Sequence, residues 1–300
     1  MPPAIRLAGK LLAQTWKGWN AHNAPRMGAA LAYYTTFSMA PMLIIAIAVA
    51  GVVFGPEAAR SEVSLQMSGL LGATGAKAVE EMIANANHGG AGVIATIIGM
   101  VTLLLGASSL FAELRSALNL IWDAPPPAKV GFVTMLRTRF LSFAMVLVIG
   151  FLLLVSLVIS ATLSGVQSHV GGFISPPVIA QAVNVVVSLI VTTSLFALIY
   201  KVLPDVKIAW KDVWVGAFAT AILFAIGKLI IGLYLGNGAL ASSYGAAGSL
   251  AVMLVWIYYS AQLILFGAEF TQVYAHRHGS KAGEDRASER PVAAPAAPSV

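Results

Sequence analysis

Residues 140–163 read FLSFAMVLVIGFLLLVSLVISATL and contain no charged side chain. This run is longer than the roughly 20 apolar residues that a helix needs to cross a bilayer. A helix satisfies its backbone hydrogen bonds within its own segment, which hydrocarbon requires. The apolar residues do not alternate with polar ones, as they would in a strand of a membrane barrel. The stretch therefore predicts a transmembrane helix.

Charges and turn sequences divide the rest of the chain into similar runs. The uncharged run that begins at 140 extends to 200, which is long enough for two spans, and SHVGGFISPP at 168–177 divides it. A second turn sequence, GNGALASSYG at 236–245, divides the last apolar region. We therefore expect an all-α, polytopic membrane protein with six transmembrane helices, over about residues 27–54, 92–111, 140–163, 178–201, 213–235 and 246–272.

The composition supports this class and excludes others. Of the 300 residues, 58% are hydrophobic and 10% are charged, whereas soluble globular chains are about 25% charged. The absence of Cys excludes thiolate chemistry, Cys-based zinc sites and a disulfide scaffold. The sequence also lacks a phosphate-binding GxxxxGK[ST] motif and a zinc-binding HExxH motif. We expect no metal, no cofactor and no catalytic residue, and hence no enzyme.

The Lys and Arg residues predict the orientation of the spans. Fifteen of the 18 lie ahead of the first span, between spans two and three, between spans four and five, or after span six. Only Arg60 and Lys77 lie in the opposite connections, and Lys228 lies within a span. Because cytoplasmic connections carry the excess of cations, both termini are expected in the cytoplasm. Membrane lipids are the expected partners of these cations, through the anionic headgroups of the inner leaflet.

Three regions are expected outside the bilayer. Residues 1–26 contain an amphipathic helix with Trp16 and Trp19 on its apolar face and cations roughly opposite, which is typical of a helix lying among headgroups. Packing on the cytoplasmic connections is the alternative. The long outer connection 55–91 could dock an envelope protein. The cytoplasmic tail, 273–300, is rich in Ala, Pro and charge and is expected to be disordered.

Ionisable and polar residues within the spans, 27–272, are the first candidate functional residues. Lys228 could contact an anionic headgroup or substrate, or could extend its ammonium group to the outer interface. Glu269 shares a helix face with Gln262 and Tyr258, and this row could line a polar cavity. Alternatively, Glu269 pairs with a cation near the inner leaflet: Arg115, Arg137 or Arg139.

The first span and the cytoplasmic ends supply the remaining candidates. Tyr34 precedes Pro41, which is expected to bend the first span beside a cavity, although packing alone would also explain these residues. A structural belt of charged and polar residues is expected on the cytoplasmic side: Glu113, Arg115, Asn119, Asp123 and Asp205. Rows of small residues, such as Ala217, Ala221 and Ala225, would let helices of one chain approach closely, or would form the seam of a homo-oligomer.

Four segments resemble the YihY/BrkB family of bacterial inner-membrane proteins, which has also carried a ribonuclease BN label. They are RMGAALAYYTTFSMAP (26–41), SSLFAELRSALNLIWD (108–123), YKVLPDVKIAWKDVWVGAFATAILFAIGKLIIGLYLG (200–236) and SSYGAAGSLAVMLVWIYYSAQLILFGAEFTQVY (242–274). The resemblance extends over about residues 10–275. It implies a multi-pass protein of the bacterial inner membrane with six helices, and it implies little about chemistry.

Three functions are considered for this sequence. They are translocation of a hydrophobic, amphipathic or lipid-linked substrate, a structural role with an envelope partner, and membrane-bound ribonuclease activity. A nuclease needs clustered carboxylates or His to hold metals and an exposed surface for nucleic acid. The cytoplasmic acids of this chain are few and scattered. We therefore favour translocation and expect no nucleic acid among the partners.

Overall fold

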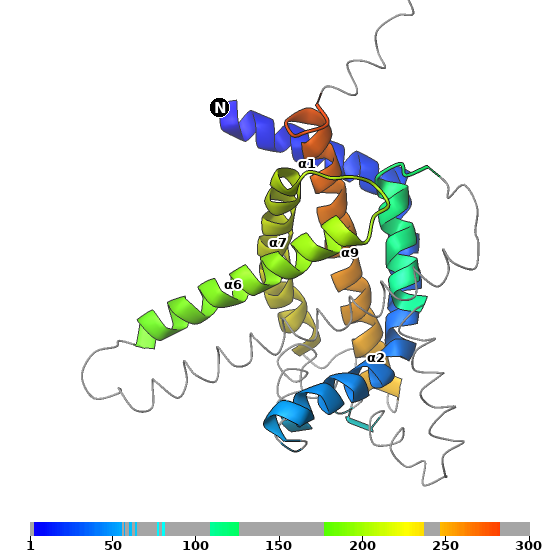
Figure 1. The fold of residues 1–300 in the computed structure, drawn as a ribbon, viewed down its shortest axis with the longest axis vertical. Helices are drawn as coiled ribbons and strands as arrows, with labels where there is room; N and C mark the ends of the chain where they lie inside the picture. The colour runs from blue at the N-terminus through cyan, green and yellow to red at the C-terminus, as the bar shows by residue number, and fades with distance from the viewer. Residues whose placement is uncertain are drawn as a thin grey trace, which may run out of the picture.

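The computed structural model describes residues 3–55, 109–125, 177–236 and 247–282, together with seven single residues between 57 and 81. These ranges are helices joined by turns, and they contain no strand (Figure 1). The described part of the chain therefore agrees with the all-α class. The expected spans 92–111 and 140–163 lie outside the described residues, except for 109–111.

Four of the six expected spans are present as helices. The helices with defined bounds are α1 (Pro3–Ala21), α2 (Ala24–Phe54), α6 (Pro177–Val202), α7 (Trp210–Gly236) and α9 (Gly248–Arg277). A further helical segment covers 109–121. Within the described residues, three stretches are long and apolar enough to cross a membrane: Val185–Val202, Trp210–Tyr234 and Leu250–Arg277.

Helix α9 is the centre of the arrangement, because it packs against α1, α2 and α7. Figure 1 shows α7 and α9 running side by side, α6 crossing α7 obliquely, and α1 lying across the ends of α7 and α9. α6 ends two residues before Pro204, since a proline disfavours helical geometry in the residue that precedes it. In this arrangement the N-terminal helix α1 lies against the C-terminal part of α9.

Glycine and threonine pair reciprocally where α7 packs on α9. A Cβ atom at Gly216 of α7 would lie 1.8 Å from Thr271 Oγ1, and one at Gly267 of α9 would lie 2.0 Å from Thr220 Oγ1. Each threonine donates its hydroxyl to the glycine carbonyl of its own helix, at 2.7 Å. The two helices therefore approach closely without leaving an unpaired hydroxyl at the seam.

Tyr200 joins a third helix to this seam. The Tyr200 side chain is fully buried, and its hydroxyl donates to the carbonyl oxygen of Ile264 on α9 at 2.8 Å. The same hydroxyl lies 3.2 Å from Thr220 Oγ1 on α7. Ala217 and Ala221 are also buried in this core. This part of the small-residue row therefore serves packing within one chain.

α2 has two limbs that meet at an angle (Figure 1). Pro41 lies near the middle of the helix and is its only proline beyond the first turn. A proline in a helix interior removes one backbone hydrogen bond and clashes with the preceding turn, so sharp kinks usually form there. The bend expected in the first span is present, and the cavity expected beside it stays a prediction.

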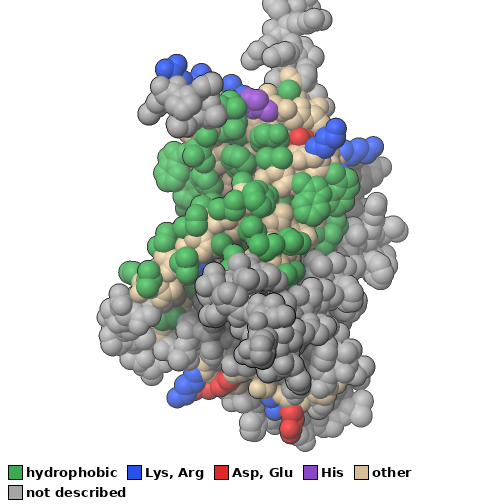
Figure 2. Space-filling view, turned by 90° about the vertical axis from the view of Figure 1, so that its left-hand side faces the viewer, with side chains coloured by type: hydrophobic (Ala, Val, Ile, Leu, Met, Phe, Trp, Pro, Cys, Tyr) green, Lys and Arg blue, Asp and Glu red, His purple; other side chains and the backbone are tan. Residues whose placement is uncertain are grey.

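Apolar side chains cover the middle of the molecule on the face that Figure 2 presents, and charged side chains gather at its two ends. The exposed hydrophobic residues of α6 and α7 are Val185, Val186, Ile190, Val202, Trp210, Trp214, Val215, Phe218, Ile222, Ile226, Leu229, Ile230, Leu233 and Tyr234. Soluble monomers rarely expose a continuous apolar surface of this kind. The distribution is that of helices in contact with lipid tails.

Candidate functional site

α1 contacts α9 through a narrow face. Leu11 and Thr15 are buried, and Gly18 follows on the same face, against the carboxylate of Glu269. A Cβ atom at Gly18 would lie 2.6 Å from Glu269 Oε2, so only glycine fits without a shift. The docking face thus combines Leu11 and two small residues with Trp19, which packs against the core.

The apolar face expected on this helix lies beside the docking face. Leu12 and Trp16 are exposed, and the Trp16 and Trp19 rings stack with their centroids 5.0 Å apart. α1 therefore packs on the protein, but mainly on helix α9 and not on the connections that the alternative interpretation named. It also keeps apolar and basic side chains at its surface, as the interfacial interpretation expected.

Glu269 is a carboxylate buried within an apolar helix. Its side chain is 1% exposed, and its Oε1 lies 2.6 Å from His22 Nδ1, in the turn between α1 and α2. Asp123, in the turn after the segment 109–121, adds a second negative charge to its surroundings. Among the described residues, Glu269 Oε2 has no hydrogen-bond partner. A buried carboxylate is tolerated when a partner compensates its charge, and His22 is placed to do so.

His22 was not among the expected partners of Glu269. The sequence offered Arg115, which instead pairs with Asp205. The other two candidates, Arg137 and Arg139, lie outside the described residues. The actual partner comes from a position 247 residues away along the chain. It is an isolated histidine flanked by Ala21, which no motif distinguishes.

Gln262 lies two helical turns from Glu269 and faces α2. Its Nε2 donates to the carbonyl oxygen of Ala24 at 3.3 Å, and its Oε1 is buried without a partner among the described residues. Gly28 leaves room for this side chain, because a Cβ atom there would lie 1.8 Å from Gln262 Nε2 and 3.6 Å from Tyr258 Cε2. The shared face of Tyr258, Gln262 and Glu269 is therefore turned toward α1 and α2.

Lys228 and Tyr34 are placed elsewhere. Lys228 is exposed on α7 beside Leu229 and Ile230, which are also exposed, and it forms no ion pair with any residue that the structure describes. Tyr34 is exposed on α2 and packs edge-on against Tyr33, with ring centroids 5.5 Å apart. Neither contacts the buried pair.

Three of the expected belt residues form a clamp between the segment 109–121 and the turn after α6. Arg115 donates to both carboxylate oxygens of Asp205, with Nε 3.0 Å from Oδ2. Asn119 donates its Nδ2 to the same Oδ2 at 2.7 Å, and its Oδ1 accepts the Asp205 backbone N–H at 2.8 Å. Glu113 is half-buried, and Asp123 is exposed in a left-handed turn, with φ 49°.

The chain after α9 is ordered further than expected. The helix continues to Arg277, and Ser280 then donates its backbone N–H and its hydroxyl to the buried Asp212 of α7, at 3.0 and 2.6 Å. Lys281 lies over the Trp122 ring, 5.8 Å from its centroid. Disorder from 273 onward is therefore wrong for 273–282, because these contacts anchor the segment. Residues 283–300 lie outside the described residues.

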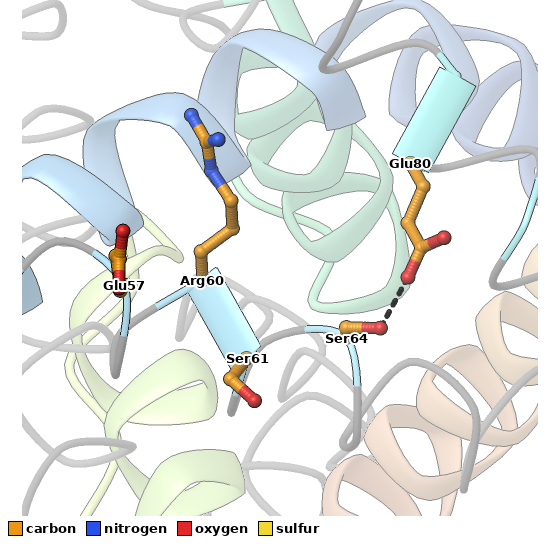
Figure 3. A pocket seen from close by; sticks show the side chains of 5 residues that line it. All are labelled: Glu57, Arg60, Ser61, Ser64 and Glu80. Atoms are coloured by element: carbon orange, nitrogen blue, oxygen red, sulfur yellow. Dashed lines mark hydrogen bonds between the residues drawn. The ribbon is translucent and has the colours of Figure 1, made fainter.

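A hollow of about 500 Å³ opens among residues of the expected outer connection (Figure 3). Its lining consists of Glu57, Arg60, Ser61, Ser64 and Glu80. The Ser64 hydroxyl donates to a carboxylate oxygen of Glu80, which ties two parts of the connection together. Most of its lining residues are solvent-exposed and polar. In the described ranges, no group of three His, Cys, Asp or Glu side chains could hold a metal ion.

Comparison with known proteins identifies relatives along most of the chain. The family model described as "Virulence factor BrkB" matches residues 15–292. The UPF0761 membrane protein YihY of Shigella boydii is 27% identical over 248 residues, covering 77% of this chain and 78% of the relative. A UPF0761 membrane protein of Yersinia pestis is 28% identical over 212 residues, covering 68% and 66%. No solved structure matches. The chain is a membrane protein that belongs to the YihY/BrkB family.

Proposed function

We propose that this protein crosses the bacterial inner membrane six times, with both termini in the cytoplasm, and translocates a hydrophobic, amphipathic or lipid-linked substrate. The observation that supports translocation is the polar face of α9, where the buried Glu269 and the half-buried Gln262 lie among apolar helices. Polar and ionisable groups at such positions are costly, and they usually mark substrate or ion pathways. In this proposal the protein is not an enzyme.

Anionic lipid is the proposed partner of α1. Arg6, Lys10 and Lys17 are exposed on this helix, together with Leu12 and Trp16. α1 lies across the ends of α7 and α9 (Figure 1), so it would run along the membrane plane if those helices span the bilayer. Each cation near an anionic leaflet contributes about 1 kcal/mol. The inner leaflet would thus hold α1 at the interface.

Single cysteines test the proposed topology, because the natural chain contains none. We expect Ser61→Cys to react with a membrane-impermeant maleimide in spheroplasts, since its side chain is exposed in the connection proposed to face outside. Gly9→Cys on α1, where a Cβ atom meets no other atom within 4 Å, should react only after permeabilisation. The reverse pattern of labelling would exclude cytoplasmic termini.

Fluorescent phospholipid tests translocation. The full-length protein would be reconstituted into vesicles that contain phosphatidylethanolamine with a nitrobenzoxadiazole headgroup label, and dithionite would report how much label reaches the outer leaflet. We expect faster exchange than in protein-free vesicles, and a loss of at least half of that gain in Gln262→Leu and in Lys228→Met. Wild-type vesicles that exchange label no faster than protein-free ones would count against translocation of this class of substrate.

Docking of an envelope protein is the second candidate function. The charged hollow around Arg60 and Glu80 favours it, because such exposed polar surfaces suit a polar partner. Deletion of residues 60–86 distinguishes the two candidate functions when the shortened protein is tested in the same lipid-exchange assay. A translocation core would keep its lipid exchange after the deletion. If the protein acts only by docking through this connection, neither the full-length protein nor the deletion variant should exchange lipid in vesicles. In cells, the deletion variant should then fail to replace the full-length protein.

A further inference from the structure

We propose that His22 and Glu269 form an occluded proton-binding site, and that α1 is the cover of this site. The inference rests on the proposed translocation in one respect: if the protein moves a substrate, the proton bound here would be the ion whose movement is coupled to that transport. Proton binding itself can be measured without any substrate. The two proposals can therefore fail independently.

The pair extends from the protein surface into its interior. The His22 side chain is 22% exposed, the Glu269 side chain is 1% exposed, and 2.6 Å separates Nδ1 from Oε1. At this separation one proton can be held between the two atoms. Because imidazole has a second ring nitrogen, it can accept a proton at Nε2 and release one at Nδ1. His22 therefore gives the buried carboxylate a route for protons.

The space around Glu269 selects a proton over a larger cation. Oε2 has no hydrogen-bond partner among the described residues, and a single methyl group on Gly18 would already lie 2.6 Å from it. Metal ions need several ligand atoms at about 2.0–2.6 Å, and no such group of side chains is present in the described ranges. A proton can bind here while α1 stays in place.

Charge links proton occupancy to the position of α1. In the part of the chain that the structure describes, the charged and titratable groups that act on Glu269 are His22 of the α1–α2 turn and Asp123 of the turn after 109–121. With one proton on the pair, the charges of His22 and Glu269 cancel. When that proton leaves through His22, a buried negative charge remains near the negative Asp123, in surroundings that screen it poorly. Lifting α1 would admit water to this charge.

Infrared titration of the full-length protein in lipid nanodiscs tests the proton site. The wild type should show a C=O band of a protonated carboxyl group that changes with pH, and Glu269→Gln should lose this band. Asp212→Asn is the matched control, because Asp212 is also buried but accepts two hydrogen bonds from Ser280; it should keep the band. The same titrating band in wild type and Glu269→Gln, or none in the wild type, would overturn the proposal.

The cover is tested in a chain that keeps both His22 and Glu269. Dicyclohexylcarbodiimide reacts with protonated carboxyl groups in apolar surroundings, and peptide mass spectrometry locates the product. We expect Gly18→Leu to label faster at Glu269 than the wild type, while Gly9→Leu on the same helix labels at the wild-type rate, because Gly9 has open space around it. Equal labelling of all three proteins would show that α1 does not cover the site.

The outcomes separate this inference from the proposed function. If the wild type exchanges no labelled lipid but Glu269→Gln loses the titrating band, the proton site stands and translocation of that lipid fails. If lipid exchange is present and the band persists in Glu269→Gln, translocation stands and the proton site is wrong.

Discussion

Replacing Gly267 with alanine is expected to destabilise the folded protein by about 3 kcal/mol, at the upper end of what overpacking costs. The new Cβ atom would lie 2.0 Å from Thr220 Oγ1 and 2.6 Å from the Tyr200 hydroxyl. Both groups are buried and hydrogen-bonded between helices, so neither can move without breaking a bond. Thermal unfolding in detergent, followed by circular dichroism, measures the loss.

Matched variants identify the cause of that loss. Gly232→Ala lies on α7, where a Cβ atom meets nothing within 4 Å, and alanine gains up to about 1 kcal/mol in helix propensity over glycine. It should leave the unfolding temperature unchanged or raise it. Gly267→Ala combined with Thr220→Ala should recover part of the loss, because the closest clashing atom is removed. A Gly267→Ala protein as stable as the wild type would refute close packing at this seam.

The helices of the described core were predictable because a helix satisfies its backbone hydrogen bonds within its own segment, as a long apolar run in a membrane protein requires. Long uncharged runs therefore fixed α2, α6, α7 and α9 without knowledge of their neighbours. The same criterion placed an end at 111, where Glu113 and Arg115 follow, although helix continues to 121. Charged residues mark the expected limit of a span but do not by themselves end a helix, and Arg115 pairs with Asp205.

The sequence singled out Glu269 as a candidate but did not reveal its contacts. The distribution of cations predicts that Glu269 lies near the inner end of its span, and this depth stays a prediction. Which helices are neighbours depends on side-chain shape, which hydropathy does not report. The informative residue was Gly18, because its missing side chain lets α1 approach Glu269, and a lone glycine in an amphipathic helix carries no signal of this kind.

The buried His22–Glu269 pair and the exposed Arg115–Asp205 pair are expected to respond very differently when one partner is removed. His22→Leu leaves Glu269 without a described partner for either carboxylate oxygen, and loss of one partner from a buried pair costs about 3 kcal/mol. Arg115→Leu breaks a pair in which the Asp205 side chain is 47% exposed. Water can solvate that carboxylate, so the expected cost is about 1 kcal/mol or less. Unfolding in detergent at neutral pH compares the two variants.

A second substitution separates a buried charge from lost packing. If the cost of His22→Leu arises from the unpaired carboxylate, then His22→Leu combined with Glu269→Leu should be more stable than His22→Leu alone, because no charge remains to be buried. Adding Asp205→Leu to Arg115→Leu should bring no such recovery, since its carboxylate was already hydrated. If the costs of the two single substitutions simply add in each pair, then packing alone holds Glu269 in place. In that case α1 would stay docked on α9 whether or not Glu269 is charged.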